Sequence, residues 1–345
     1  MNIGHKIKQK RTNAGMTQEQ LSLKLGVSAQ SVSKWETGIT MPDIALLPDI
    51  SEAFGISIDE LFDLTNEQKL KRIESKIELE EEFSPEMFRE YEDFLREQLV
   101  TDNRLQAVSL LANLYHRRME SDSKAVAKYA KEAILLDPSK KDCQWLLAKA
   151  EGHVVWDWNM ANHSKAIDFY KEVIESDKII PKTSLPYYYL IDNLIADNRI
   201  AEAEYYLNQL SRLPSASKVL LDVYPAYFAL SCHMVDDADR IIQQCVENNP
   251  ESGAYLFEAA QYYARRCDYD KAIEFYERSW NAEKSPRFTD ALYGIATIYH
   301  IRKDKEREVE TFDRILECLK NEWGYSNEDK PYIETLREKM QIINK

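Results

Sequence analysis

Three hydrogen-bonding side chains share one face of a short predicted helix near the N-terminus. Gln30, Ser33 and Lys34 fall outside the apolar stripe of this helix, which Val32 and Trp35 form. An amide, a hydroxyl and an ammonium group on a helix that fits the major groove suit hydrogen bonding to base edges. The chemistry predicted for this segment is therefore recognition of double-stranded DNA.

The chain lacks the residue patterns of common catalytic, metal and cofactor sites. No G-x-x-x-x-G-K-[ST], G-x-S-x-G or H-E-x-x-H motif occurs, and the 6 histidines do not cluster. The 5 cysteines have no metal-ligand spacing, so we expect reduced packing residues in a cytoplasmic protein. No apolar run approaches the ~18 residues of a membrane span. We expect no enzyme, no metal, no cofactor and no membrane partner.

Turn and cap signals divide residues 1–64 into five short helices. Thr17 and Gln20 have the spacing of a capping box at the start of the second helix, and Gly26 suits its C-terminal end. Ser28 is placed to cap the third helix, residues 29–36. Two such helices joined by a three-residue turn describe a helix-turn-helix.

This segment resembles the helix-turn-helix domain of the Cro/phage-repressor (XRE) family. The resemblance rests on R-x-x-x-G-x-T-Q-x-x-L, L-G-V-S, S-x-W-E-x-G and G-I-S-I-D-E-L-F, and it covers residues 3–62 of the 345. It implies a five-helix DNA-binding domain over residues 1–64. The third helix of this domain would enter the major groove of a palindromic operator.

The resemblance also implies which side chains contact DNA. By position, the family's contacts fall on Gln18, Ser28, Ala29, Gln30, Ser33, Lys34, Thr37 and Thr40. Of these, Ala29, Gln30 and Lys34 would face the bases. Ser33 would lie at the margin, and the remaining four would lie near phosphates. The natural pairings are Gln30 with adenine and Lys34 with guanine, each worth ~1–3 kcal/mol of discrimination.

Five positions of this pattern also have structural interpretations. Arg11 and Glu36 match family positions that pair with each other, which favours a salt bridge over a phosphate contact by Arg11. Trp35 is expected in the core rather than as a platform for base stacking. Ser28 and Thr37 would shape the ends of the third helix even without DNA.

Charge is divided unevenly along the chain. The formal net charge is −14, yet residues 1–42 contain six basic and two acidic residues, a balance of +4, which leaves −18 for the remainder. A basic head on an acidic body is typical of a DNA-binding module whose body avoids phosphate.

Residues 65–84 form a charged helical linker between the head and the rest of the chain. Leu70, Ile73 and Ile77 make a narrow apolar stripe along it. The stripe leaves two interpretations open: a connector helix that dimerises, or a helix that docks on the body. Ser84 and Pro85 begin the next helix.

Residues 85–345 are predicted to form an all-α solenoid of helical hairpins. Scarce glycine and the absence of alternating strand patterns favour an all-α fold. A recurring helical pattern is marked by Val126, Ala166, Ala203, Ala238, Ala272 and Glu308, at spacings of 34 to 40 residues. The pattern resembles tetratricopeptide repeats, whose period is about 34 residues. About six hairpins would fill residues 104–320, and the helix PYIETLREKM would cap the end.

The first helix of each hairpin would face a concave groove. The repeat register places Asn113, His116, Arg117, Tyr188, Asp192, Tyr227, Gln261, Arg265, Thr297 and His300 on that side. Amides, tyrosines and arginines suit an extended peptide, whose backbone needs donors and acceptors and whose carboxylate needs a cation. The alternative is that these residues are solvated groove residues without a ligand.

An XRE head followed by tetratricopeptide repeats resembles the peptide-sensing (quorum-sensing) transcriptional regulators of Gram-positive bacteria. That resemblance implies a homodimer whose repeats bind a short signalling peptide. Two alternatives remain: a DNA-binding regulator whose repeats dock a folded protein, and an adaptor whose head no longer binds DNA. The basic head argues against the adaptor.

Overall fold

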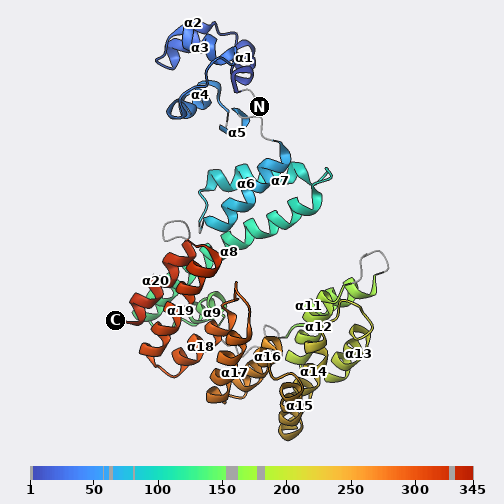
Figure 1. Cartoon of the computed structure of the whole chain (residues 1–345). Helices are drawn as coiled ribbons and strands as arrows, with labels where there is room; N and C mark the ends of the chain where they lie inside the picture. The colour runs from blue at the N-terminus through green and yellow to red at the C-terminus, as the bar shows by residue number, and fades with distance from the viewer. Residues whose placement is uncertain are drawn as a thin grey trace. The chain divides into compact units, whose positions relative to one another are not determined.

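The computed structural model describes residues 3–56, 58–61, 65–80, 82–152, 162–176, 183–325 and 331–344. In these ranges every regular element is a helix, which confirms the all-α prediction (Figure 1). None of the described helices combines the length and apolarity needed to cross a membrane. The chain divides into two compact units, Met1–Pro138 and Ser139–Lys345, so the predicted linker region groups with the head.

The first unit begins with the five-helix head. Its elements are α1 (Ile3–Asn13), α2 (Gln18–Lys24), α3 (Ala29–Glu36), the 3-10 turn η1 (Ile44–Leu46), α4 (Leu47–Phe54) and α5 (Ile58–Leu61). Each helix contributes a side chain to one apolar core, including Ile7, Leu21, Val32, Ile50 and Leu61. Burial of this shared core fixes the helices relative to one another.

The helix ends in the head follow the predicted local signals. The Thr17 hydroxyl accepts a hydrogen bond from the Gln20 backbone nitrogen at 3.1 Å, and the Gln20 side chain accepts one from the Thr17 nitrogen at 2.8 Å. Gly26 has φ +65°, a left-handed conformation that glycine adopts without a Cβ penalty. Ser28 caps α3. The turn between α2 and α3 therefore holds α3 at a defined angle.

A separate apolar core in the first unit joins α6 (Asn66–Leu79), α7 (Pro85–Gln98) and α8 (Arg104–Leu136). Leu70, Ile73 and Ile77 of α6 are buried in this core beside Phe88 and Leu114. The linker stripe is therefore used within the chain, which favours the docked-helix interpretation over a dimerising connector.

The first predicted hairpin is wrong. Residues 104–136 form α8, one continuous helix of 33 residues, where the repeat pattern predicted two helices and a turn. The stretch contains no glycine or proline, and its polar middle, ESDSK, has no residue that ends a helix. Nothing local therefore breaks α8.

The second unit contains the repeats. It begins with α9 (Lys141–Ala150) and α11 (Ser164–Glu175). Four hairpins follow: α12 (Leu185–Ala196) with α13 (Ile200–Leu210), α14 (Lys218–Ser231) with α15 (Val235–Asn248), α16 (Gly253–Arg265) with α17 (Tyr269–Ala282), and α18 (Asp290–Ile301) with α19 (Lys305–Trp323). The closing helix α20 (Pro331–Ile343) buries Ile333 and Leu336 in the same core, as predicted for a cap.

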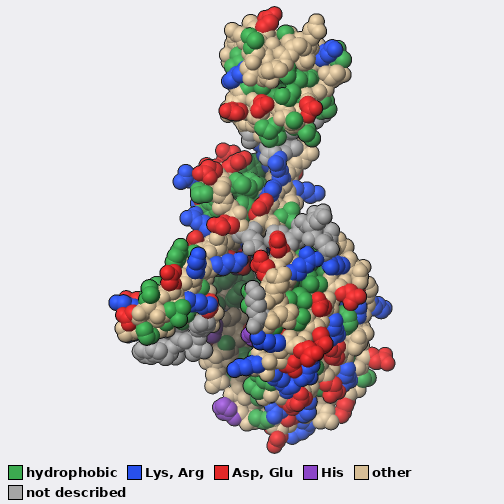
Figure 2. Space-filling view, turned by 90° about the vertical axis from the view of Figure 1, so that its left-hand side faces the viewer, with side chains coloured by type: hydrophobic (Ala, Val, Ile, Leu, Met, Phe, Trp, Pro, Cys, Tyr) green, Lys and Arg blue, Asp and Glu red, His purple; other side chains and the backbone are tan. Residues whose placement is uncertain are grey.

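Four of the six predicted repeat positions lie in the repeat core, whereas Ala166 is half-buried and Val126 is exposed on α8. Ala203, Ala238 and Ala272 are fully buried on the second helices, and Glu308 at the same register is 3% exposed. Small residues let neighbouring hairpins approach closely. Acidic and basic side chains are interspersed over the surface of the second unit (Figure 2).

Gly294 is a close-approach site between α18 and α17. A Cβ at this position would lie 2.5 Å from Cζ of Tyr276, whose ring is buried. We expect Gly294→Ala to lower the free energy of unfolding by ~1–3 kcal/mol, because the added methyl group would overlap this buried ring and force it to shift. Thermal unfolding of the full chain measures this effect. Thr297→Ala, at an exposed position of the same helix, is the control, and equal melting temperatures for the two variants would contradict the prediction.

Candidate DNA-binding helix and inner-helix cluster

The polar face of α3 is presented to solvent by a buried apolar face. Val32 is fully buried and Trp35 is 5% exposed, which confirms Trp35 as a core residue. Gln30 and Lys34 are exposed on the other side, while Ala29 and Ser33 are half-buried. An exposed amide and ammonium one helical turn apart are free to meet adjacent base pairs.

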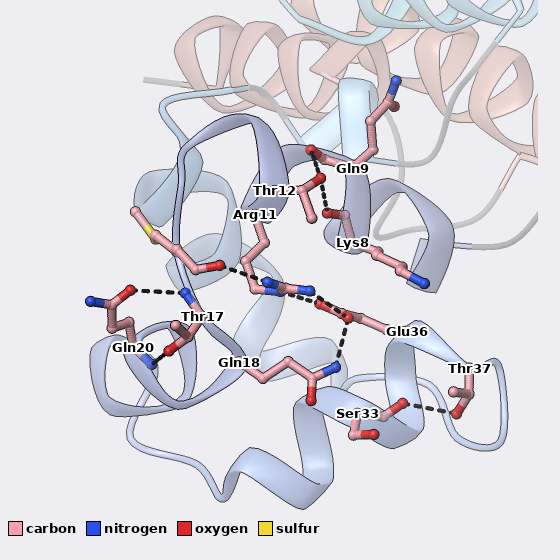
Figure 3. Close-up of polar contacts among 11 residues, drawn as sticks. Lys8, Gln9, Arg11, Thr12, Thr17, Gln18, Gln20, Ser33, Glu36 and Thr37 are labelled. Carbon is pink, nitrogen blue, oxygen red and sulfur yellow. Dashed lines mark hydrogen bonds and ion pairs between the residues drawn. The ribbon is translucent and has the colours of Figure 1, made fainter.

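A buried carboxylate ties α3 to the two preceding helices (Figure 3). Glu36 is 4% exposed and accepts hydrogen bonds from Arg11 Nε at 2.6 Å and Arg11 Nη2 at 3.0 Å. Gln18 Nε2 donates to the same carboxylate at 2.8 Å, and Arg11 Nη1 donates to the Met16 carbonyl at 2.6 Å. The predicted Arg11–Glu36 salt bridge is confirmed, with Gln18 as a third member.

The hydrogen bonds of this network lower the pKa of Glu36 although the side chain is buried. Burial by itself raises the pKa of a carboxyl group, but the hydrogen bonds from Arg11 and Gln18 together outweigh it. The pKa of Glu36 is therefore below its ordinary value, and the carboxylate stays ionised. This fixed charge orients the start of α2 against the end of α3.

The other predicted DNA contacts surround the ends of α3. The Ser28 hydroxyl accepts a hydrogen bond from the Ser31 nitrogen at 3.1 Å, and the Thr37 hydroxyl donates to the Ser33 carbonyl at 2.8 Å. Thr40 is exposed in the loop that follows. These hydroxyls shape the helix ends, and their contacts with phosphate remain a prediction.

In the second unit, five of the predicted groove residues, Gln261 included, lie on the first helices of three successive hairpins. Tyr188 and Asp192 lie on α12, Tyr227 on α14 and Arg265 on α16. The Tyr188 hydroxyl accepts a hydrogen bond from the Ser217 nitrogen at 2.6 Å. The Arg265 guanidinium lies 4.7 Å from the centre of the Tyr227 ring.

Two residues that sequence reasoning missed complete this group. The Tyr224 hydroxyl donates to Asp192 at 3.1 Å, and the Tyr227 hydroxyl donates to Glu258 at 3.3 Å. A signal was present: Tyr224 lies three residues before Tyr227, and Glu258 three residues before the predicted Gln261, so each shares a helix face with a predicted residue. We define the inner-helix cluster by its members: Asp192, Tyr224, Tyr227, Glu258 and Arg265.

The inner-helix cluster holds two carboxyl groups at the protein surface: Glu258 is half-buried, while Asp192 and Arg265 are exposed. Burial raises the pKa of Asp192 and of Glu258, against the opposing effects of their tyrosine hydrogen bonds and of Arg265. The charge of Asp192 also raises the pKa of Glu258. Two acidic groups share one nearby cation, so the cluster carries net negative charge when both are ionised.

The remaining predicted groove residues have other surroundings. Thr297 Oγ1 donates to the Tyr293 carbonyl at 2.8 Å, and His300 Nδ1 lies 3.0 Å from a carboxylate oxygen of Glu308. Gln261 is half-buried on α16. The other three predicted residues lie on α8 in the first unit: Asn113, His116 and Arg117.

Arg117 makes its contacts within the first unit. Its Nε donates to the Ile77 carbonyl at 3.1 Å, and it lines a cleft of about 370 Å³ with Phe88 and Arg118. His116 lies 3.6 Å from Glu120 on its own helix. These contacts belong to the packing of α6, α7 and α8.

An exposed polar helix, set by a tight turn after a preceding helix, defines a helix-turn-helix DNA-binding domain. A family model described as "Helix-turn-helix" matches residues 7–61. The HTH-type transcriptional activator BcrR of Enterococcus faecalis is 44% identical over 61 residues, which are 18% of this chain and 30% of that protein. An uncharacterized HTH-type transcriptional regulator of Methanocaldococcus jannaschii is 38% identical over 58 residues, 17% of this chain and 88% of that protein. The chain belongs to the helix-turn-helix family of transcriptional regulators.

The alignments with these two relatives cover 17% to 18% of this chain, and the chain covers less than a third of the length of BcrR. Among solved structures, PlcR of Bacillus thuringiensis in complex with a peptide and DNA aligns over 99% of this chain and 98% of that chain, at 12% identity and a TM-score of 0.22. The PrgX/iCF10 complex covers 87% of this chain and 96% of that chain, at 15% identity and a TM-score of 0.29. TM-scores this low assign no ligand to the repeat unit.

Proposed function

We propose that this protein is a dimeric, sequence-specific transcriptional regulator whose repeat unit binds a short peptide that carries a positive charge. DNA recognition is supported by the exposed Gln30 and Lys34 on α3. Effector binding is supported by the geometry of the inner-helix cluster, in which Tyr224 donates to Asp192, Tyr227 donates to Glu258, and Arg265 lies over the Tyr227 ring. Peptide binding would change the affinity for the operator by favouring one arrangement of the two heads.

The charge of the ligand follows from the charge of the cluster. A half-buried carboxylate such as that of Glu258 is costly unless a cation and hydrogen bonds compensate it. Arg265 and the two tyrosine hydroxyls supply only part of that compensation, since both pKa values stay raised. An ammonium or guanidinium group from a ligand would supply the rest. The sequence predicts a cation that binds the carboxylate of the peptide. Arg265, the cation at this place, already interacts with the carboxylates of Asp192 and Glu258.

The extent of the cluster supports a peptide rather than a small cation. Its residues come from the first helices of three hairpins, α12, α14 and α16. Helix α14 packs against both α12 and α16. Helices pack about 8–10 Å apart, so the three span about 16–20 Å. An extended chain covers that distance with about five or six residues. Tyrosine rings along this span offer both apolar contact and hydrogen-bonding groups.

The proposal predicts that Asp192→Asn/Glu258→Gln weakens peptide binding by about 10- to 100-fold, since a hydrogen bond to a charged group is worth ~1.5–3 kcal/mol. The substitutions keep side-chain shape and remove charge. The probe is a pool of synthetic hexapeptides, half with a lysine and half with norleucine at the same position, added to the full chain. Native mass spectrometry identifies the peptides that stay bound. The matched control is Asp313→Asn/Glu317→Gln, at exposed positions of α19.

The same peptides should bind more weakly as the pH falls. The ordinary pKa values of Asp192 and Glu258 are 3.8 and 4.5, and burial raises both. A bound cation favours the ionised carboxylates, so binding releases protons and is lost as the pH falls through the raised values. Retention of lysine and norleucine peptides alike would contradict the proposal. A stoichiometric protein that copurifies with the chain, with no peptide bound, would favour the docking alternative.

A further inference from the structure

Helix α8 carries an exposed stripe with a seven-residue repeat. The stripe consists of Leu105, Val108, Ala112, Tyr115, Met119, Asp122, Val126, Tyr129, Ala133 and Leu136, at alternating separations of three and four residues. Leu105 and Leu136 are each 82% exposed, Tyr129 is 65% exposed and Met119 is 61% exposed. Ala133 is half-buried, and the other members are exposed.

This stripe is distinct from the face that anchors α8 in its own chain. Ala107, Leu110 and Leu114 are buried in the core shared with α6 and α7. Figure 1 shows α8 running along those two helices. The anchored face leaves the stripe on a second side of the helix. Tyr115 lies at the border of the two sides: it is 42% exposed, its ring meets Phe88 and its hydroxyl donates to Glu92 at 2.5 Å.

A seven-residue apolar repeat indicates a partner helix. Positions three and four residues apart stay on one seam only when two helices wind around each other, because a lone α-helix has 3.6 residues per turn. The α8 repeat is sustained over more than four heptads, which exceeds the three to four that indicate a coiled coil. We infer that α8 of two copies of this chain pack together as an antiparallel coiled coil and form the dimer.

The one charged residue of the stripe selects the antiparallel arrangement. In a parallel pair Asp122 would face Asp122 of the second copy, and like charges in a seam repel. In an antiparallel pair, the two helices can cross over at the point between Glu120 and Ser121. Each residue then faces the one that lies equally far on the other side of this point, so Asp122 faces Met119 of the second copy. Arg118 of the second copy then lies beside that layer, and Arg118 already approaches Asp122 within its own helix at 3.9 Å. Opposite charges therefore meet at the centre of the antiparallel seam.

The same centre matches every other layer. Leu105 faces Leu136 of the second copy, Val108 faces Ala133, Ala112 faces Tyr129 and Tyr115 faces Val126. In heptad notation, position a is held by Leu105, Ala112, Met119, Val126 and Ala133, and position d by the other stripe members. Each layer therefore pairs an a residue with a d residue, as antiparallel packing requires. Tyr129 lies opposite the small Ala112. The seam therefore has no layer with two bulky aromatic rings.

The register also explains why the first repeat is a straight helix. A hairpin would bring the two halves of the stripe together within one chain. In the straight α8, Val108 and Ala133 are about 38 Å apart at 1.5 Å per residue, so they meet only between copies. The second copy supplies the contacts of the missing hairpin, as in an exchange of helical elements between protomers.

This inference rests on the dimer in the proposed function, and its test is independent of DNA and peptide. Val108→Cys/Ala133→Cys is introduced into the full chain, which is oxidised mildly and analysed on a non-reducing gel and by peptide mass mapping. We expect a covalent dimer with a 108–133 link between chains. The control is Val108→Cys/Lys128→Cys, because Lys128 lies off the stripe. A 108–133 link within a monomer, or no 108–133 link, would overturn the inference.

A second variant tests the seam without crosslinking. Met119→Glu would place an acidic group against Asp122 of the second copy, and we expect the dimer dissociation constant to rise at least tenfold in sedimentation equilibrium. Met119 is 61% exposed, so the substitution leaves the packing of the chain intact. Gln106→Glu, off the stripe on the same helix, is the matched control. A dimer that survives Met119→Glu unchanged would overturn the α8 seam, while operator and peptide binding by that dimer would leave the proposed function standing.

Discussion

Replacing Gln30 and Lys34 together by alanine is expected to remove the preference of this protein for its operator while the head stays folded. Both side chains are exposed on α3, so their loss leaves the apolar core unchanged. Each well-aligned pairing with a base is worth ~1–3 kcal/mol. The double variant should therefore lose about 30-fold to 10⁴-fold in the ratio of specific to non-specific affinity, at 1.4 kcal/mol per factor of ten.

The measurement needs an operator, which repeated selection from random duplex DNA with the unmodified protein supplies. Fluorescence anisotropy at one salt concentration then gives affinities for the selected duplex and for a scrambled duplex. The matched control is Lys8→Ala/Gln9→Ala, which removes the same two residue types from exposed positions of α1. A base-reading role for α3 is excluded if both double variants keep the same affinity ratio as the unmodified protein.

Arg11→Met is expected to be the most damaging single substitution in the head, at ~3–5 kcal/mol of domain stability. Among the described residues, it would leave Glu36, which is 4% exposed, with the Gln18 amide as its one hydrogen-bond partner. Breaking a buried pair by removing one partner costs more than the pair itself contributes, because the remaining charge stays buried. The loss should be partly reversed in Arg11→Met/Glu36→Gln, which removes the stranded charge.

Hydrogen exchange of the α3 amides in the full chain reads this stability directly, without interference from the repeats. Because the pKa of Glu36 is lowered in the folded state, its contribution is present above its ordinary pKa of 4.5 and is lost as the pH falls through the lowered folded value. Protection of α3 in the unmodified protein should therefore fall in acid. Equal protection in Arg11→Met and the unmodified protein at pH 7 would show that the pair is not stabilising.

The head shows how far local sequence reasoning extends. Three features of the head depend on residues within three or four positions of one another: the capping box at Thr17, the cap at Ser28 and the turn at Gly26. The local sequence therefore predicts them. The salt bridge between Arg11 and Glu36 spans 25 residues, and it was predictable only because the family pattern matches both positions. Gln18 was predicted near DNA, and its bond to Glu36 had no local signal.

The apolar stripe on α6 shows what an apolar period cannot predict, which is the partner that the stripe packs against. Leu70, Ile73 and Ile77 predicted an apolar face but not its partner, since a dimer and a docked helix bury the same residues. The partners Phe88 and Leu114 lie far along the chain and become neighbours only through the packing of α7 and α8.

By itself, the sequence determined an all-α chain with a helix-turn-helix head and a helical repeat body, because cap residues, turn glycines and apolar periods act over a few residues or recur at a fixed spacing. Tertiary structure decided two further points. Residues 104–136 form one helix where the repeat pattern predicted a hairpin, because the period of an apolar pattern does not say whether a turn separates its two halves. Asp192 and Glu258, 66 residues apart, lie in one surface cluster, because the packing of α12, α14 and α16 against one another brings them together.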